Sequence, residues 1–215
     1  MKVGILGSGD VGCSLAKGFV ASGHTVKIGT RKAAPPKVAE WVETSGGSGS
    51  VGTFADAAQF GEVVVLATRG IAVEEAIDVA GVEQFEGKVV IDVTNPLAFS
   101  QGGSVSLARG FTTSNGEEVQ RRLPRARVVK AFNIVGNSLF YRPALPGGPP
   151  DMYVCGNDAA AKGTVTEILH DFGWPSVIDI GGIEGSRELE SLCILWVKTG
   201  VALQNFEIAY KVLRK

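Results

Sequence analysis

The chain has few of the residues that metal sites and disulfide frameworks need. Its 215 residues include only two histidines and three cysteines, and the cysteines are Cys13, Cys155 and Cys193. An odd number of widely spaced thiols, with no Cys-x-x-Cys motif and no histidine at metal-ligand spacing, argues against both kinds of site. We therefore expect three small buried side chains in a reducing compartment and no bound metal.

The chain also lacks an excess of charge and a long apolar run. Its 21 basic residues nearly balance its 22 acidic ones, so no overall positive field would attract nucleic acid or an anionic membrane. No apolar stretch reaches the roughly 18 residues that a membrane-spanning helix needs. The sequence opens on a strand pattern, without a basic segment and an apolar signal core. These absences predict a cytoplasmic protein whose partner is a small molecule.

A glycine motif follows the first strand pattern. Residues 2–6 are mostly apolar, Gly7-Ser8-Gly9-Asp10-Val11-Gly12 comes next, and an apolar-periodic stretch continues to Val20. In such a turn the first glycine permits a sharp bend, the second lets a pyrophosphate approach, and the third lets the helix lie close to the sheet. The free N–H groups at the helix start would bind the pyrophosphate. Because the motif joins a strand to a helix, we interpret residues 7–12 as a dinucleotide-binding turn and not as a plain strand-to-helix turn without a ligand.

The end of the second strand pattern, residues 25–30, indicates which dinucleotide binds. An NAD site usually has an acidic residue here for the ribose hydroxyl, whereas an NADP site needs cations for a 2′-phosphate. This chain has Thr30-Arg31-Lys32, and the first acidic residue after them is Glu40. Arginine and threonine can donate to a phosphate that a carboxylate would repel. We therefore expect NADP(H), although an exposed basic turn without a ligand would have the same sequence.

The rest of the chain alternates strand and helix patterns, which predicts a doubly wound, mostly parallel α/β sheet of Rossmann type. Further strands are expected at 51–53, 62–67, 88–93, 127–132, 151–155 and 176–180, and helices at 36–43, 54–59, 72–80, 116–122 and 158–171. Residues 98–126 are expected to form a polar excursion whose only element is the short helix. A helical pattern continues from Gly185 to the end, bent at Gly200. We expect one domain, 1–215, whose last helix packs on its own sheet or at a homodimer interface.

Ligands of an open parallel sheet bind beyond the carboxyl ends of its strands. The loops after the later strands therefore supply further candidate residues for the cofactor. These are Ala67, Thr68, Arg69, Thr94, Asn95, Pro96, Leu97 and Asn133. The small and apolar residues among them suit the nearly dry, preorganised face that hydride transfer requires.

No side chain presents itself as the proton donor that reduction of a carbonyl or imine would need. His24 lies at the wrong end of the predicted sheet, and His170 lies late on a helix. Lys130 and Tyr141 have suitable chemistry, but Lys130 lies inside a strand pattern and a structural role is favoured for both. No catalytic residue is assigned. An acceptor that takes hydride without a protein acid, such as a flavin or deazaflavin ring, is favoured.

Several further motifs carry a resemblance that extends over nearly the whole chain. They are Gly29-Thr30-Arg31, Asp92-Val93-Thr94-Asn95-Pro96-Leu97, Val129-Lys130-Ala131-Phe132-Asn133, Val154-Cys155-Gly156-Asn157-Asp158 and Ser186-Arg187-Glu188-Leu189-Glu190-Ser191-Leu192. With the glycine motif, they resemble the NADP oxidoreductases that depend on the 8-hydroxy-5-deazaflavin coenzyme F420. The chain is also similar to the cytosolic domain of the six-transmembrane epithelial antigen metalloreductases, whose acceptor is a flavin.

The resemblance implies roles for individual residues. Ser8 to Val11 would hold the pyrophosphate, Thr30 and Arg31 the 2′-phosphate, and Ala67 and Thr68 would flank the nicotinamide. A deazaflavin would stack on that ring and exchange hydride with it directly.

Two departures leave the acceptor open. Arg69-Gly70-Ile71 stands where the archaeal enzymes carry a Pro-Trp pair, and Asn133 stands where they carry histidine. Coenzyme F420 and a flavin both remain candidates, as do a small carbonyl or imine. A sensor that binds NADP(H) without turnover is the alternative of another class.

Overall fold

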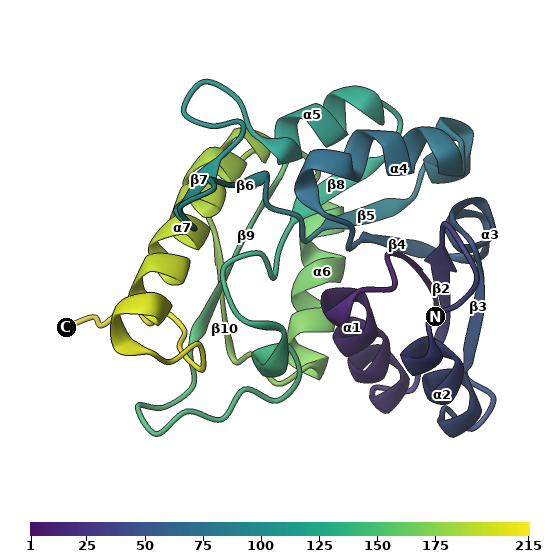
Figure 1. The fold of residues 1–215 in the computed structure, drawn as a ribbon, viewed down its shortest axis with the longest axis horizontal. Coiled ribbons are helices and arrows are strands. Elements are labelled where there is room, and N and C mark those ends of the chain that lie inside the picture. Colours follow the sequence, from purple (N-terminus) through teal and green to yellow (C-terminus); the bar gives the residue numbers. More distant parts are fainter.

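Eight strands form the sheet that runs through the molecule, in the order β10-β9-β8-β5-β4-β1-β2-β3 (Figure 1). The computed structural model describes residues 1–215. The strands are β1 (Lys2–Leu6), β2 (Thr25–Thr30), β3 (Gly49–Thr53), β4 (Val63–Leu66), β5 (Val89–Asp92), β8 (Arg127–Lys130), β9 (Asp151–Gly156) and β10 (Ser176–Asp179). Each begins and ends within about two residues of its expected bounds. The clearest are β4 and β5, because continuous β-branched runs mark buried parallel strands.

The strand directions place the carboxyl ends of six strands at one edge of the sheet. Strands β1, β2, β3, β4, β5 and β8 are parallel, and only β9 and β10 run the other way, with β9 antiparallel to β8. From β1 the chain proceeds outward through β2 and β3, then returns to the other side of β1 for β4, β5 and β8. A crevice is expected where the order reverses, between β1 and β4. The predicted doubly wound Rossmann-type sheet is confirmed.

Helices cover both faces of the sheet. On one face lie α1 (Asp10–Ala21), α2 (Pro36–Thr44) and α6 (Ala159–Asp171), whose buried side chains share one apolar cluster. On the other face α3 (Phe54–Phe60), α4 (Val73–Ala80) and α5 (Asn115–Arg122) pack over a second cluster. The last helix, α7 (Ser186–Leu203), lies beside α5, and its Leu189 joins the first cluster. The rings of Phe19 on α1 and Phe172, the residue after α6, pack edge to face with their centroids 4.8 Å apart, which links the two helices.

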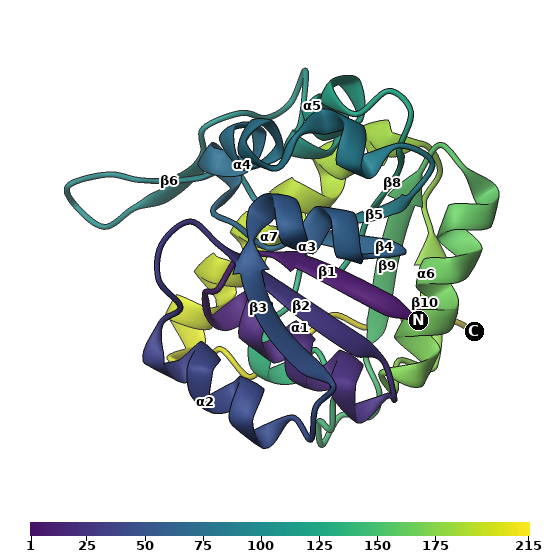
Figure 2. The same cartoon turned by 90° about the vertical axis from the view of Figure 1, so that its right-hand side faces the viewer.

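A two-stranded hairpin interrupts the segment that was expected to contain only a helix. Strands β6 (Leu97–Phe99) and β7 (Val105–Leu107) pair antiparallel and project from the body of the molecule (Figure 2). Each strand has three residues and neither is buried, so no apolar alternation marks them in the sequence. The hairpin leads directly out of the loop after β5, which places it beside the carboxyl edge of the sheet.

The last helix is shorter than its pattern indicated. It passes through Gly200 without interruption and ends at Leu203, where Gln204 adopts a left-handed conformation with φ 51°. The chain then folds back, and the Trp196 indole N–H donates to the Ile208 carbonyl at 2.9 Å. Gly200 leaves room for Phe206, whose ring atoms would lie 2.5 Å from a Cβ at that position. The expectation of a helix to the end was therefore wrong. None of the helices is both long and apolar enough to cross a membrane.

Candidate functional site

A cleft of about 620 Å³ lies at the carboxyl edge of the sheet, where the strand order reverses. Its volume falls within the range of small-molecule sites. Eleven residues that the sequence marked as candidates line it: Ser8, Gly9, Asp10, Val11, Arg31, Ala67, Thr68, Arg69, Thr94, Asn95 and Leu97. The loops after β1, β2, β4 and β5 thus converge on one cavity.

Eight further residues line the cleft: Phe54, Gly70, Ile71, Ala72, Ala76, Val93, Phe99 and Asn137. Gly70 and Ile71 continue the loop after β4 and could be anticipated from it. Phe99 comes from the hairpin. Asn137 lies in a short helical turn, and its side-chain Nδ2 donates to the Ser14 hydroxyl oxygen at 2.9 Å. No local pattern signals either of them, because their place in the wall depends on how distant segments pack.

The first and third glycines of the motif lie beneath the cleft and do not line it. Gly7 has φ 135°, and a Cβ there would lie 2.3 Å from the Ala67 carbonyl oxygen. A Cβ at Gly12 would lie 2.0 Å from the Gly7 carbonyl oxygen. By contrast, a Cβ at Gly9 would meet no atom within 4 Å, so the space above the turn is open.

The start of α1 offers unused donors to this open space. Gly9 is the N-cap residue, and no side chain accepts a hydrogen bond from the first turn. The free N–H groups and the helix dipole favour an anion there. The one nearby carboxylate, Asp10, lies 2.7 Å from the Lys37 ammonium, whose hydrogen bond lowers the pKa of Asp10. Lys37 therefore offsets a charge that would otherwise repel a phosphate.

The residues at the end of β2 are placed differently from one another. Arg31 lines the cleft, and its Nη1 lies 3.9 Å from Glu75 Oε1 on α4. The Thr30 hydroxyl donates to the Lys32 carbonyl within the same turn, and Thr30 is buried. Lys32 is exposed and forms no ion pair within 4.0 Å. The roles of Thr30 and Lys32 toward a 2′-phosphate stay predictions, whereas Arg31 already faces the cavity.

Thr68 carries an unpaired polar atom at the cleft. Its hydroxyl oxygen is buried and has no hydrogen-bond partner within the protein. Buried polar atoms nearly always have a partner, so this hydroxyl fits a bond to a bound molecule. Together with the open glycine turn and Arg31, it makes the cleft suited to a dinucleotide.

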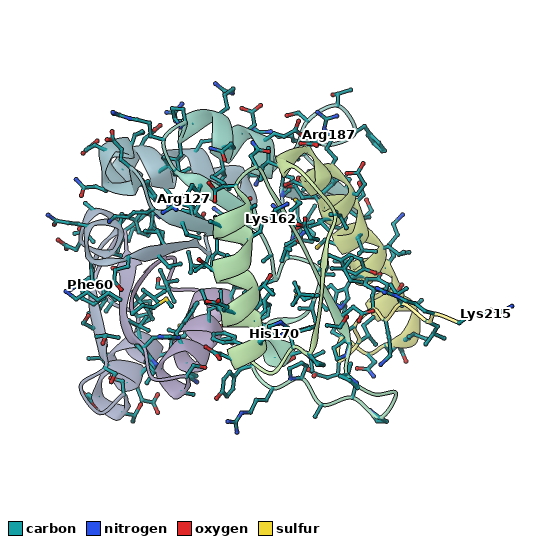
Figure 3. All side chains as sticks on the ribbon, turned by 180° about the vertical axis from the view of Figure 1, so that it is seen from behind. Phe60, Arg127, Lys162, His170, Arg187 and Lys215 are labelled. Carbon is teal, nitrogen blue, oxygen red and sulfur yellow. The ribbon has the colours of Figure 1, made fainter.

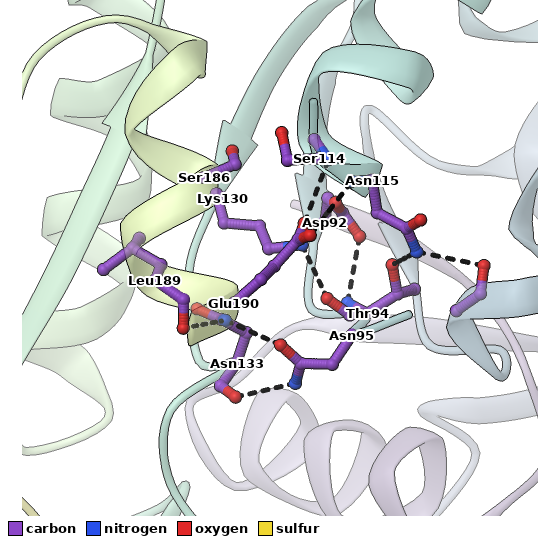
Figure 4. A network of polar contacts seen from close by, with 12 residues as sticks. Asp92, Thr94, Asn95, Ser114, Asn115, Lys130, Asn133, Ser186, Leu189 and Glu190 are labelled. Atoms are coloured by element: carbon purple, nitrogen blue, oxygen red, sulfur yellow. Dashed lines mark hydrogen bonds and ion pairs between the residues drawn. The ribbon is translucent and has the colours of Figure 1, made fainter. Parts of the chain in front are cut away.

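A buried ion group lies behind the cleft, at the start of α7 (Figure 4). Lys130 Nζ donates to Asp92 Oδ2 at 2.9 Å, Glu190 Oε1 at 2.7 Å and the Thr94 carbonyl at 2.5 Å. These bonds use all three ammonium hydrogens. Burial disfavours the charged form, but the two carboxylates outweigh it and raise the pKa of Lys130. Lys130 therefore stays charged and does not line the cleft.

Asn133 also acts from behind the cleft wall. Its Nδ2 donates to Asn95 Oδ1 at 2.9 Å and to the Leu189 carbonyl at 3.0 Å, and its backbone carbonyl accepts from Asn95 Nδ2 at 2.8 Å. Asn95 lines the cavity and Asn133 does not. Pro96 is likewise buried beside the wall. Any effect of Asn133 on a ligand would pass through Asn95.

The remaining candidates for a proton donor lie elsewhere. Tyr141 packs edge-on against Phe172, with ring centroids 5.5 Å apart. His170 lies on α6, where one ring nitrogen is 2.9 Å from the Trp174 carbonyl oxygen (Figure 3). Neither lines the cleft.

A doubly wound sheet, a glycine turn opening α1 and a cavity at the reversal of strand order define a dinucleotide-binding protein of Rossmann type. The family model described as "NADP oxidoreductase coenzyme F420-dependent" matches residues 2–96. The F420-dependent NADP reductase of Methanocaldococcus jannaschii is 30% identical over 97% of this chain and 100% of its own length. The chain belongs to this family of NADP-dependent oxidoreductases.

Two other similarities extend the comparison. A crystal structure from Arthrobacter sp. FB24, described as a candidate F420-dependent NADP reductase, covers 100% of both chains with 38% identity and a TM-score of 0.94. Metalloreductase STEAP3 of Rattus norvegicus is 33% identical over 89% of this chain but only 36% of its own length. The chain thus spans about a third of that metalloreductase. The names of these relatives specify different acceptors.

Proposed function

We propose that this protein exchanges hydride between NADP(H) and a deazaflavin or flavin ring that binds in the same cleft. One observation carries the proposal: the cavity joins an anion-binding glycine turn and Arg31 to an apolar opening that holds no proton-donating acid or histidine. Asp10 is the one carboxylic acid in the lining, and its lowered pKa keeps it ionised. When bound, NADPH supplies the hydride, and a ring acceptor takes it without a protein acid.

The dinucleotide end of the cleft is built by β1 and β2. The N–H groups at the start of α1 would hold the pyrophosphate, because no side chain caps them. Arg31 would donate to the 2′-phosphate with its planar guanidinium. The Thr68 hydroxyl, which has no partner in the protein, would bond to the nicotinamide half.

The acceptor end is an apolar rim with one cation. Ile71 and Phe99 line the cleft although the two residues are 62% and 70% exposed. Exposed apolar surface beside a cavity is typical of a site that a ligand covers, and a planar ring would cover both side chains. Arg69 lines the same side, is exposed and has no carboxylate within 4.0 Å. It suits an acceptor that carries an anionic side chain.

The reduction of a carbonyl or imine gains no support from the site. Lys130 has used all its hydrogens in the buried ion group. Tyr141 is half-buried, packs against the first apolar cluster and does not line the cavity. A sensor without turnover would use the same cleft for NADP(H), so an activity measurement separates it from the proposal.

The experiment mixes the full chain with NADPH and coenzyme F420, flavin mononucleotide or riboflavin, and follows the absorbance of reduced nicotinamide. We expect acceptor-dependent oxidation with at least one ring, and a cyclic imine as the control acceptor should give none. If none of the three rings caused oxidation of NADPH, the proposal would be contradicted. Tight NADPH binding without turnover would support the sensor.

A charge reversal tests the cofactor assignment separately. Arg31→Asp should weaken NADPH binding far more than NADH binding, because only NADPH carries the 2′-phosphate. Arg214→Asp changes an exposed residue that does not line the cleft and is the matched control. Equal effects of Arg31→Asp on both dinucleotides would contradict the role of Arg31.

A further inference from the structure

Asn115 bridges two of the loops that form the cleft wall. It is the first residue of α5 and is 1% exposed. Its Nδ2 donates to the Gly70 carbonyl at 2.9 Å and to the Thr94 hydroxyl oxygen at 3.0 Å (Figure 4). Gly70 follows β4 and Thr94 follows β5, and both line the cavity. Asn115 itself does not line it, so its amide acts on the site from behind.

The two loops touch backbone to backbone at this point. A Cβ at Gly70 would lie 2.1 Å from the Asn95 carbonyl oxygen and 2.7 Å from Asn115 Nδ2. Only a glycine permits this approach, and the amide of Asn115 closes it by bonding to both loops. One side-chain amide thus joins the two loops at the point where they meet.

Asn115 is in turn fixed by the buried ion group. Its backbone N–H donates to Glu190 Oε2 at 3.1 Å, and the Gly116 N–H donates to Glu190 Oε1 at 3.2 Å. The positive end of the α5 dipole also favours a carboxylate here. Glu190 is held by Lys130 at 2.7 Å. The first turn of α5 is thus tied to the ion group through one carboxylate.

Thr94 is tied to the same ion group from the other side. Its carbonyl accepts from Lys130 Nζ at 2.5 Å, and its backbone N–H donates to Asp92 Oδ1 at 2.9 Å. Its hydroxyl completes the link through Asn115. Backbone and side chain of Thr94 are therefore both immobilised by groups that never reach the cavity.

We propose that Asn115 is a positioning residue for the acceptor side of the cleft, and that Lys130 serves this arrangement and not proton transfer. The inference rests on the proposed function, since hydride transfer between two rings requires reacting atoms about 3 to 3.5 Å apart. Without the amide, the loops after β4 and β5 lose the side-chain bonds that join them, and the rim formed by Ile71 and Phe99 is held less firmly. The glycine turn after β1 and Arg31 after β2 have no bond to Asn115 and keep their places.

The test compares Asn115→Leu and Asn115→Asp with the unchanged full chain. Leucine has a similar size but donates nothing, and aspartate sets an oxygen against the Gly70 carbonyl oxygen. We expect kcat/KM for the ring acceptor to fall about 10- to 100-fold. The Kd for NADPH should rise by less than about fivefold, because the glycine turn and Arg31 stay in place and only the Thr68 hydroxyl lies on a loop that moves. The control is Asn157→Asp, because Asn157 Oδ1 only accepts a bond, from the Ile183 N–H at 2.9 Å, and a carboxylate preserves it.

A second measurement needs no acceptor. Amide hydrogen exchange should quicken at 68–72 and 93–97 in Asn115→Leu and stay unchanged at 7–12 and 30–32. If the protein reduces no ring, the proposed function fails and this pattern alone decides the role of Asn115. If neither variant folds, Thr94→Val removes one of the two bonds and is measured in the same way. The inference would be overturned if the Asn115 variants showed unchanged hydrogen exchange and an acceptor kcat/KM within about twofold of the parent. Equal changes in the control Asn157→Asp would overturn it as well.

Discussion

The ion pair between Arg31 and Glu75 predicts that NADPH binds against an internal competitor. Glu75 Oε1 lies 3.9 Å from Arg31 Nη1, and the two side chains are 66% and 54% exposed. At about 4 Å, two unit charges attract by about 1 kcal/mol in water and about 4 kcal/mol at the dielectric of a protein surface. Because both side chains are more than half exposed, the measured range for exposed pairs, roughly 0.2–1 kcal/mol, is the better guide.

Glu75→Gln should therefore tighten NADPH binding by about 1.4- to 5-fold, the range that roughly 0.2–1 kcal/mol corresponds to. The substitution frees the guanidinium for the 2′-phosphate and removes a negative charge beside it. NADH lacks that phosphate, so its affinity should not change. The gain should shrink at high salt, because exposed charges are screened.

The assay titrates each protein with NADPH and NADH, following nicotinamide fluorescence at low and high ionic strength. Glu74→Gln is the matched control, since Glu74 precedes Glu75 on the same helix but pairs with Arg109 at 2.8 Å. If Glu75→Gln left NADPH affinity unchanged, or tightened NADH equally, Glu75 would not compete with the 2′-phosphate.

Three further predictions concern stability. Lys130→Met leaves two buried carboxylates without their ammonium and should lower the free energy of unfolding in urea by about 3–5 kcal/mol. An unchanged urea midpoint of unfolding would refute the role of the ion group. Gly12→Ala sets a Cβ 2.0 Å from the Gly7 carbonyl oxygen, so it should destabilise the fold by about 1–3 kcal/mol and weaken NADPH binding. Normal stability together with normal NADPH binding would count against the close packing of α1 on the glycine turn. The hydrogen bond from Arg187 lowers the pKa of Glu117, so the stability it contributes is present above the ordinary pKa of glutamate and is lost as the pH falls through the lowered one. Glu117→Gln should flatten the acid limb of the unfolding free energy against pH, and an identical limb would argue against this pair.

Many of the site residues could be found from sequence because their signals are local. The glycines at 7, 9 and 12 have their meaning within one strand-turn-helix unit, and the basic exit at Arg31 follows from the strand before it. Eleven of the candidate residues line one cavity because parallel strands bring their carboxyl ends to the same edge. The family relationship agrees with these motifs and with the NADP-dependent class of enzyme.

The wall behind the acceptor could not be found in this way. Asn115 is 75 residues from Glu190 along the chain, and 45 residues from Gly70. A polar residue in a segment without clear periodicity has no local mark of burial, so its role appears only when α5, α7 and the sheet are assembled. The same reason hid the β6–β7 hairpin, whose Phe99 reaches the cleft.

The sequence by itself determined the doubly wound sheet, because strand and helix patterns alternate along the whole chain. It also determined the dinucleotide turn and the preference for NADP(H), since both depend on residues within about thirty positions of one another. Only the tertiary structure decided that Lys130 is a fully bonded member of an ion group and that Asn133 supports Asn95. It also decided that the last helix ends at Leu203, because the segment after it packs back on Trp196. Contacts between distant segments are set by packing and by the pairing of buried charges, and a linear pattern carries no record of either.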